Sequence, residues 1–249
     1  MTSSTLSYVT QGSGPAALVL HGGGGPATVA PIAAHLAGDH LVITPTLPGW
    51  NGTERPESFT RVSDLANAYL GLLAELGLSD VLVVGSSLGG WIAVDMATRD
   101  TAGLVGALVV IDGAGIVVPS EPMPDFFSFT PLQIAEHSWY DPSKFLFDPS
   151  SLPPEAQAVQ RANMASMAVY AGDPYMNDPS LPERLPDITA KTLLVWGASD
   201  RVFTPGYGRA YAELIPGSRF ELIEEAGHLP HLEQPQTTLA AIDAFITGA

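Results

Sequence analysis

The sequence contains no cysteine. Disulfides, metal sites ligated by cysteine and a cysteine nucleophile are therefore excluded. Basic residues are few: 10 Lys and Arg stand against 26 Asp and Glu, which gives a formal net charge of −16 at pH 7. A surface of that sign repels phosphate backbones and anionic lipid headgroups, so neither a nucleic acid nor a membrane is expected as a partner.

Long apolar runs are also lacking. No uninterrupted apolar stretch reaches the roughly 18–20 residues that cross a bilayer. The N-terminus lacks the basic region followed by an apolar run that marks a secretory signal, so we expect a cytoplasmic protein. The 249 residues, 46% of them hydrophobic, suffice for one sizeable core. The sequence leaves the oligomeric state open, including a homo-oligomer.

Short apolar runs alternate with segments of helical periodicity along most of the chain. Most of these runs show no polar alternation, as expected for strands that are covered on both faces. The alternation predicts a mainly parallel, doubly wound α/β sheet, with an additional edge strand at 6–10. The other predicted strands are 17–21, 41–44, 81–84, 107–111, 192–196 and 220–223, and the predicted helices are 29–37, 62–76, 89–98, 205–214 and 235–247.

One segment, 113–186, interrupts this alternation. It is rich in proline and aromatic residues, and only 154–170 has a clear helical pattern. Dense prolines are incompatible with a central strand and favour short helices joined by turns. We therefore predict that residues 1–112 and 187–249 form a core domain and that residues 113–186 form a mostly helical cap inserted between two strands.

The most informative local motif follows the predicted strand 81–84. Residues 85–89, GSSLG, match the pattern G-x-S-x-G, in which a serine at a tight strand-to-helix turn is exposed above the sheet. The residues two before and two after that serine must be small. This holds for Ser87 but not for Ser86, which is flanked at those positions by Val84 and Leu88. Ser87 is the candidate nucleophile, and the alternative is a turn with no catalytic role.

A serine hydroxyl needs a base to remove its proton. Of the six histidines, His228 follows the last predicted strand in the sequence AGHLPH and is the candidate base. Asp200, after the penultimate strand in WGASD, is the candidate acid that would orient the base, with a capping or surface role as its alternative. Asp112, at the end of another strand, is the rival acid. His21 is expected to brace the loop that follows it.

A tetrahedral intermediate also needs N–H donors for its oxyanion. The run HGGGGP, residues 21–26, follows a predicted strand, and its glycines allow backbone N–H groups to approach a bound oxygen. We assign one donor to Gly23, with Gly24 as the neighbouring candidate, and the other to Leu88 at a helix N-terminus. A phosphate-binding loop is disfavoured because the run lacks the lysine and the spacing of nucleotide-binding motifs.

Taken in chain order, HGGGGP, GSSLGG, WGASDRVFTP and AGHLPHLEQP resemble the α/β-hydrolase family. The resemblance covers nearly the whole chain apart from the middle of the insertion. It implies an eight-stranded sheet with a cap after the sixth strand that covers the active site, although the short N-terminus here favours seven strands. It also implies acyl transfer to water by Ser87, His228 and Asp200, a chemistry that needs neither cofactor nor metal.

Aromatic side chains are the candidates for a substrate pocket, and packing within the protein is the alternative for each. The first candidates are Phe126, Phe127 and Trp139 of the insertion, together with Trp91 on the helix after Ser87. The other aromatic residues of the insertion are Phe129, Tyr140, Phe145, Phe147, Tyr170 and Tyr175.

The resemblance leads us to predict a carboxylesterase-like serine hydrolase that acts on a small, mostly apolar ester. The alternatives are a hydrolase of C–C bonds in vinylogous diketones, a lactonase, a perhydrolase, a hydroxynitrile lyase and a non-catalytic receptor for a small molecule. Epoxide hydrolases and haloalkane dehalogenases are disfavoured, because they need a carboxylate at position 87.

Overall fold

The structure, a computed structural model, describes residues 6–145 and 149–248. These residues form a seven-stranded sheet in the order β1-β3-β2-β4-β5-β6-β7. β1 pairs with β3 antiparallel, and all other neighbouring strands are parallel. The strands are β1 (Ser7–Gln11), β2 (Ala16–Leu20), β3 (Leu41–Thr46), β4 (Val81–Ser86), β5 (Val105–Ile111), β6 (Lys191–Gly197) and β7 (Arg219–Ile223).

The prediction of a mainly parallel α/β sheet is confirmed, and every predicted strand is present with small shifts at its ends. The central strands are buried because both of their faces are covered; in β4 every residue is buried. No eighth strand occurs among the described residues. The insertion follows the fifth strand of the described chain, between β5 and β6, and not a sixth strand as the eight-stranded pattern implied.

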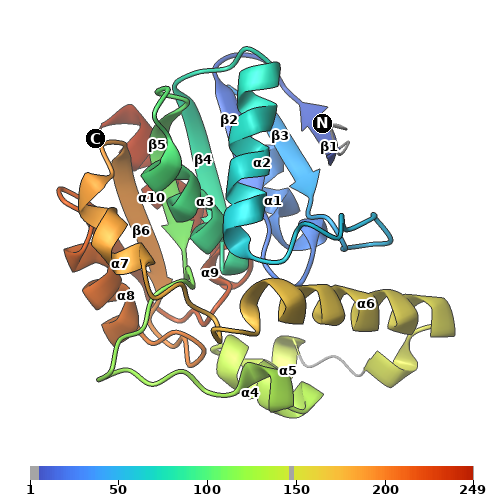
Figure 1. Ribbon diagram of the computed structural model, residues 1–249. Helices are drawn as coiled ribbons and strands as arrows, with labels where there is room; N and C mark the ends of the chain where they lie inside the picture. Colours follow the sequence, from blue (N-terminus) through green and yellow to red (C-terminus); the bar gives the residue numbers. More distant parts are fainter. Residues whose placement is uncertain (1–5, 146–148, 249) are drawn as a thin grey trace.

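Helices cover both faces of the sheet (Figure 1). α2 (Val62–Glu75), α3 (Leu88–Arg99) and α8 (Pro205–Glu213) pack in one hydrophobic cluster with one face of the strands. α1 (Ala30–Leu36) and α10 (Pro235–Thr247) pack in a second cluster with the other face. Alternate residues of the buried strands enter the two clusters, as the period of two residues requires; in β2, Leu18 and Leu20 enter the first and Ala17 and Val19 the second. No helix of the described chain is long and apolar enough to span a bilayer.

The segment between β5 and β6 is helical and lies across the carboxyl ends of the strands (Figure 1). Its helices are α4 (Pro131–Ser138), α5 (Pro142–Phe145), α6 (Pro154–Ala171) and α7 (Leu181–Arg184). Both ends of the segment, including Ile116 and Leu185, are buried in the same cluster as the sheet. The division into core and cap at residues 113 and 186 stays a prediction. Short 3₁₀ turns occur at Pro26–Val29, Phe126–Ser128, Pro149–Ser151 and Leu185–Asp187.

Candidate active site

Ser87 occupies the turn between β4 and α3. Its φ of 56° and ψ of −118° lie outside the regions that non-glycine residues usually adopt. The two flanking glycines explain how so sharp a turn fits. A Cβ on Gly85 would lie 2.1 Å from the carbonyl oxygen of Gly89, and a Cβ on Gly89 would lie 2.2 Å from that of Leu20. The backbone thus holds the Ser87 side chain at the carboxyl edge of the sheet.

Ser87, His228 and Asp200 form a continuous chain of hydrogen bonds. The Ser87 hydroxyl donates to His228 Nε2 over 2.9 Å, and His228 Nδ1–H donates to Asp200 Oδ2 over 2.8 Å. This assignment of the ring proton follows from the carboxylate, which can only accept. All three side chains are more than nine-tenths buried. Such a chain can make a serine hydroxyl nucleophilic by moving its proton to the imidazole.

Asp200 is fixed by its own loop. Its Oδ1 accepts the N–H groups of Val202 at 2.7 Å and Phe203 at 3.1 Å, so its Oδ2 is free to orient His228. The rival acid, Asp112, accepts the N–H of Gly197 and makes no hydrogen bond to His228. The geometry therefore favours Asp200 over Asp112 as the partner of the imidazole.

Two other histidines lie close to this chain, and neither is placed to act as its base. His21 braces the next loop as expected: Nδ1–H donates to the carbonyl oxygen of Gly22 over 2.6 Å, and Nε2 accepts the N–H of Leu47 over 3.0 Å. His231 donates to the carbonyl oxygen of Thr28 over 3.0 Å. Burial lowers the pKa of His21 and of His231 to about 4, so both imidazoles are neutral at pH 7.

The glycine run after β2 passes beside Ser87. A Cβ on Gly22 would lie 2.9 Å from the Cβ of Ser87, so only glycine allows this approach. Trp50 fixes the position of Gly23, because its Nε1–H donates to the carbonyl oxygen of Gly23 over 2.9 Å. Within the described chain, the N–H groups of Gly23, Gly24 and Leu88 have no hydrogen-bond acceptor. Two of these N–H groups are therefore available to a bound oxyanion: that of Leu88, the first residue of α3, and that of Gly23 or Gly24.

A cavity of about 420 Å³ opens above Ser87 and His228. This volume is within the range of small-molecule sites. Its walls are the glycine run, α4, the segment around α5, and α6. Of the predicted site residues, Gly23, Gly24, Phe126 and Trp139 line it. Phe145 also lines it, and its ring stacks on that of Trp139 with the centroids 4.1 Å apart. Phe147 lies outside the described residues.

Two residues predicted for the substrate pocket, Trp91 and Phe127, lie elsewhere in the structure. Trp91 is only 3% exposed and belongs to the core cluster, because its position on α3 directs it away from the cavity and against Gly115. Phe127 packs edge-on against the ring of Tyr175, with the centroids 5.7 Å apart. Neither of them lines the cavity above Ser87.

One face of α6 contributes cavity residues that were not predicted. Gln160, Asn163, Met164 and Met167 follow one another at intervals of three, one and three, as residues on one side of a helix do. The helix itself was predicted from its pattern, and the same periodicity could have identified this face. What the sequence could not indicate is which face turns toward Ser87, since that depends on packing.

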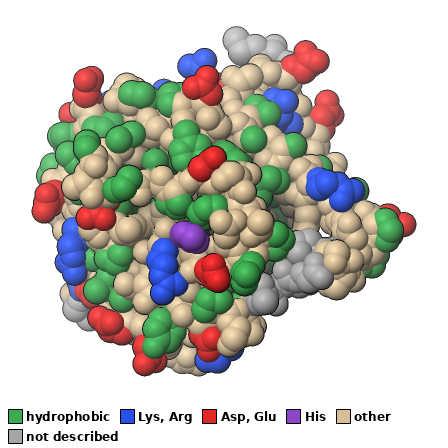
Figure 2. Space-filling model, turned by 90° about the horizontal axis from the view of Figure 1, so that it is seen from below, with side chains coloured by type: hydrophobic (Ala, Val, Ile, Leu, Met, Phe, Trp, Pro, Cys, Tyr) green, Lys and Arg blue, Asp and Glu red, His purple; other side chains and the backbone are tan. Residues whose placement is uncertain are grey.

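The cavity carries little charge. His228 is the sole titratable residue among the described residues that line it, and no Lys or Arg contributes. Figure 2 shows the face of the molecule that bears the insertion, where acidic and basic side chains are interspersed among hydrophobic ones. A bound molecule would therefore contact mainly apolar side chains and a few neutral polar groups.

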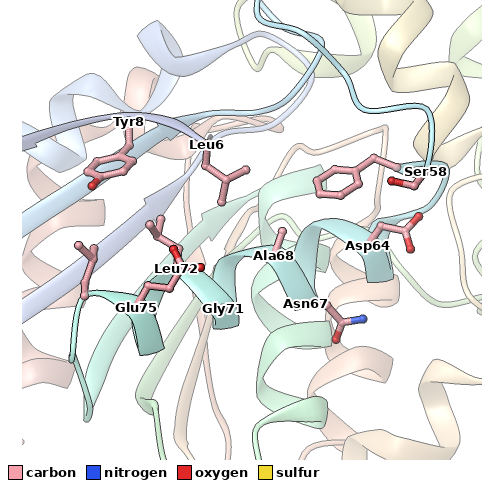
Figure 3. Close-up of a pocket in the computed structure, with 11 residues that line it drawn as sticks. Leu6, Tyr8, Ser58, Asp64, Asn67, Ala68, Gly71, Leu72 and Glu75 are labelled. Atoms are coloured by element: carbon pink, nitrogen blue, oxygen red, sulfur yellow. The ribbon is translucent and has the colours of Figure 1, made fainter. Parts of the chain in front are cut away.

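A larger hollow of about 690 Å³ lies between the start of β1 and α2 (Figure 3). Its lining includes Leu6, Tyr8, Asp64, Asn67 and Glu75. None of these residues borders the Ser87 cavity, and no histidine is among the described residues that line the hollow. It offers no nucleophile paired with a base, so the smaller cavity is the candidate active site.

Residues 17–242 match a family described as "Alpha/beta hydrolase family". The match spans most of the chain, and the protein belongs to this family. The fold and the order of the Ser87, Asp200 and His228 positions along the chain agree with that membership.

Individual relatives differ in the reactions that their names state. The chain is 29% identical to 2-hydroxy-6-oxononadienedioate/2-hydroxy-6-oxononatrienedioate hydrolase 2 of Pseudomonas putida, over 81% of this chain and 75% of that protein. It is 28% identical to lipase 3 of Moraxella sp. (strain TA144), over 95% of this chain and 78% of that one. The meta-cleavage product hydrolase of Pseudomonas fluorescens IP01 has a similar fold, with a TM-score of 0.80, 20% identity and coverage of 98% and 94%.

Proposed function

We propose that the protein is a serine hydrolase that cleaves a small, mostly apolar carboxylic ester through an acyl-enzyme at Ser87. The observation that carries the proposal is the chain of two hydrogen bonds, 2.9 Å and 2.8 Å long, from Ser87 through His228 to Asp200 beneath a largely apolar cavity. The small-molecule substrate is the only partner that this chemistry requires.

Acylation begins when Ser87 Oγ attacks the ester carbonyl carbon. His228 Nε2 takes the hydroxyl proton, and the Asp200 carboxylate stabilises the resulting imidazolium. The carbonyl oxygen, now an oxyanion, accepts the N–H of Leu88 and that of Gly23 or its neighbour Gly24. The tetrahedral intermediate then collapses, the bond to the alcohol oxygen breaks, and His228 Nε2–H protonates the leaving alcohol.

Deacylation repeats these steps with water. His228 removes a proton from a water molecule as the water oxygen attacks the acyl carbon on Ser87. The same N–H groups hold the second oxyanion. When this intermediate collapses, the bond to Ser87 Oγ breaks, and Oγ takes back the proton from His228 as the carboxylic acid leaves.

The charge of the cavity supports an ester over a dicarboxylate. The Pseudomonas putida relative is named for a dioate, a molecule with two carboxylates. A buried carboxylate needs a cationic or multiply hydrogen-bonded partner. The described lining has no Lys or Arg. The net charge of −16 also disfavours anionic substrates.

The first test is hydrolysis of p-nitrophenyl acetate, butyrate and octanoate by the wild type, Ser87→Ala and Ser86→Ala. Loss of the nucleophile should lower kcat by roughly 10⁴-fold or more with little change in KM. Ser86 is the matched control, because its buried hydroxyl has no hydrogen-bond partner in the described structure. Equal rates for the wild type and Ser87→Ala would contradict the proposal.

Hydrolysis of a C–C bond is the second candidate, and the 29% identity to the Pseudomonas putida hydrolase is the observation that favours it. Its test is the loss of visible absorbance when a 2-hydroxy-6-oxo-dienoate is added to the protein. Turnover of the dienoate without turnover of the esters would replace the first proposal. Tight binding of small molecules without turnover of either class would instead indicate a receptor.

A further inference from the structure

The proposed mechanism leaves one fully buried carboxyl group unused beside the Asp200–His228 pair. Asp112 directly follows the last residue of β5 and is 0% exposed. Its Oδ1 accepts the N–H of Gly197 over 3.0 Å, whereas its Oδ2 has no hydrogen-bond partner in the described structure. One oxygen of Asp112, one oxygen of Asp200 and one ring nitrogen of His228 all lie within 4.8 Å of one another.

Two buried carboxyl groups at such close range cannot both be ionised without a large electrostatic cost. Asp200 is the one that is stabilised as a carboxylate, because it accepts two backbone N–H groups and the imidazole N–H. Asp112 accepts a single N–H. Burial and the charge of Asp200 raise the pKa of Asp112 well above its usual value.

We propose that Asp112 is a positioning residue that, as a neutral carboxylic acid, donates its Oδ2–H to Asp200 and that replaces Asp200 as the ionised partner of His228 when Asp200 is removed. The proton on Oδ2 accounts for the buried oxygen that otherwise has no partner. In the replacement, this proton passes to solvent and Asp112 becomes a carboxylate that faces the imidazole within 4.8 Å. The inference rests on the proposed roles of Ser87, His228 and Asp200.

A cation bound by the same three groups is the competing interpretation. His228 Nδ1 and Asp200 Oδ2 are joined directly by a hydrogen bond of 2.8 Å, so two of the three donor atoms are already committed to each other. A shared proton between the two carboxyl groups needs no rearrangement of that bond.

The titration of Asp112 depends on three groups that face it. These are Asp200 from the loop after β6, His228 from the loop after β7 and Glu233 from α9 (Pro230–Glu233). Glu233 is held by the N–H groups of Gly227 and Tyr140. Removal of the charge of Asp200 leaves His228 and Glu233 facing Asp112, and an imidazolium at position 228 favours the ionised form of Asp112.

The test is a double-mutant cycle of Asp112→Asn, Asp200→Asn and the double variant. Asparagine at 112 keeps an acceptor for Gly197 and an N–H donor toward Asp200, but it cannot ionise. Two rates are measured: kcat/KM for p-nitrophenyl butyrate, and phosphonylation of the serine by a fluorophosphonate, followed by intact mass. We expect both rates to fall less than tenfold in Asp112→Asn and about 10²-fold in Asp200→Asn. In the double variant both rates should fall about 10⁴-fold, which is the loss typical of a triad whose acid is not replaced.

A pH profile separates this role from a structural one. In Asp200→Asn both rates should rise with pH as Asp112 loses its proton. The double variant should not show this rise. A loss of more than tenfold in Asp112→Asn alone would overturn the inference. The inference would also be overturned if the rates of the double variant were within tenfold of those of Asp200→Asn. Circular dichroism and Tm confirm folding, and Asp200→Ala takes the place of Asp200→Asn in the cycle if the latter does not fold.

The two proposals can fail separately. If the wild type is neither phosphonylated nor active on esters, the proposed function fails. If the wild type is phosphonylated at Ser87 and the cycle shows no additional loss in the double variant, the function stands and the role of Asp112 fails.

Discussion

The carboxyl edge of the sheet and the inner face of α6 border the same cavity, but they are built differently. At the sheet edge the backbone positions the reacting groups: the turn at Ser87 leaves no space for a side chain on Gly89, and two N–H groups hold Asp200. On α6 the cavity is shaped by side chains such as Met164 and Met167, whose flexible thioethers can adapt to a bound molecule. Changes at the edge should abolish the chemistry, whereas changes on α6 should alter substrate preference.

The attachment of α6 to the core agrees with this difference. It includes four side-chain hydrogen bonds to the loop 48–51. Asn163 Oδ1 accepts the N–H of Asn51 over 2.9 Å, and Asn163 Nδ2–H donates to Asn51 Oδ1 over 3.2 Å. Ser166 and Tyr170 donate to carbonyl oxygens of that loop over 3.0 Å and 3.2 Å. Neutral hydrogen bonds of this kind contribute about 1 kcal/mol each. Tyr170 and Ala171 also pack in the core cluster, so α6 is held to the core mainly through its side chains.

The largest effect is expected where the backbone leaves no space. In Gly89→Ala the new Cβ would lie 2.2 Å from the carbonyl oxygen of Leu20 and 2.6 Å from its carbonyl carbon, and neither backbone atom can move without distorting β2. We expect the free energy of unfolding to fall by about 3 kcal/mol or more and ester hydrolysis to be lost. Urea unfolding and kcat/KM measure the two effects.

Gly71→Ala provides the matched control. Gly71 lies in α2, and a Cβ there meets nothing within 4 Å. The substitution should stabilise the protein by roughly 0.5–1 kcal/mol, because alanine favours a helix more than glycine does. If Gly89→Ala were as stable and as active as Gly71→Ala, the constraint that we ascribe to the turn would not exist.

A second large effect is expected on the free energy of unfolding at acidic pH. The pKa of His231 is lowered by burial from 6.5 to about 4, so the unfolded chain binds a proton more readily than the folded protein between these values. The stabilisation that depends on neutral His231 is complete above pH 6.5 and is lost as the pH falls toward 4. The lowered pKa is equivalent to about 3 kcal/mol.

The measurement is the free energy of unfolding of the wild type and of His231→Gln at pH 7 and at pH 4.5. Glutamine can still donate to the carbonyl oxygen of Thr28 but does not titrate in this range. We expect the wild type to lose more stability than the variant on acidification, with the gap between them narrowing by about 2 kcal/mol or more. A gap that is the same at both pH values would contradict the role of His231.

The same difference between sheet edge and insertion explains what the sequence could predict. Strands covered on both faces appear as continuous apolar runs, and the residues after them must lie at one edge of a parallel sheet. Ser87, Asp200 and His228 could therefore be grouped from the order of strands and motifs along the chain. The sequence could not show whether Trp91 and Phe127 lie in the core or line the cavity, because an aromatic side chain packs equally well in either place. Only the packed structure shows where each of them lies.

Met167→Ala sharpens the comparison with the smallest expected effect. The Met167 sulfur lies so close to Gly23 that a Cβ there would approach it to 2.5 Å, so this side chain fills the space above the proposed oxyanion donors. Shortening it should enlarge the cavity toward longer acyl groups and raise kcat/KM for the octanoate ester relative to the butyrate by about tenfold, since each methylene accommodated in an apolar pocket is worth roughly 1 kcal/mol.

Val159→Ala, an exposed position on the same helix, should leave the ratio unchanged. If Met167→Ala instead lowered both rates by the same factor, α6 would be supporting the reacting groups and not selecting the substrate, and the two regions would not differ in the way that their construction indicates.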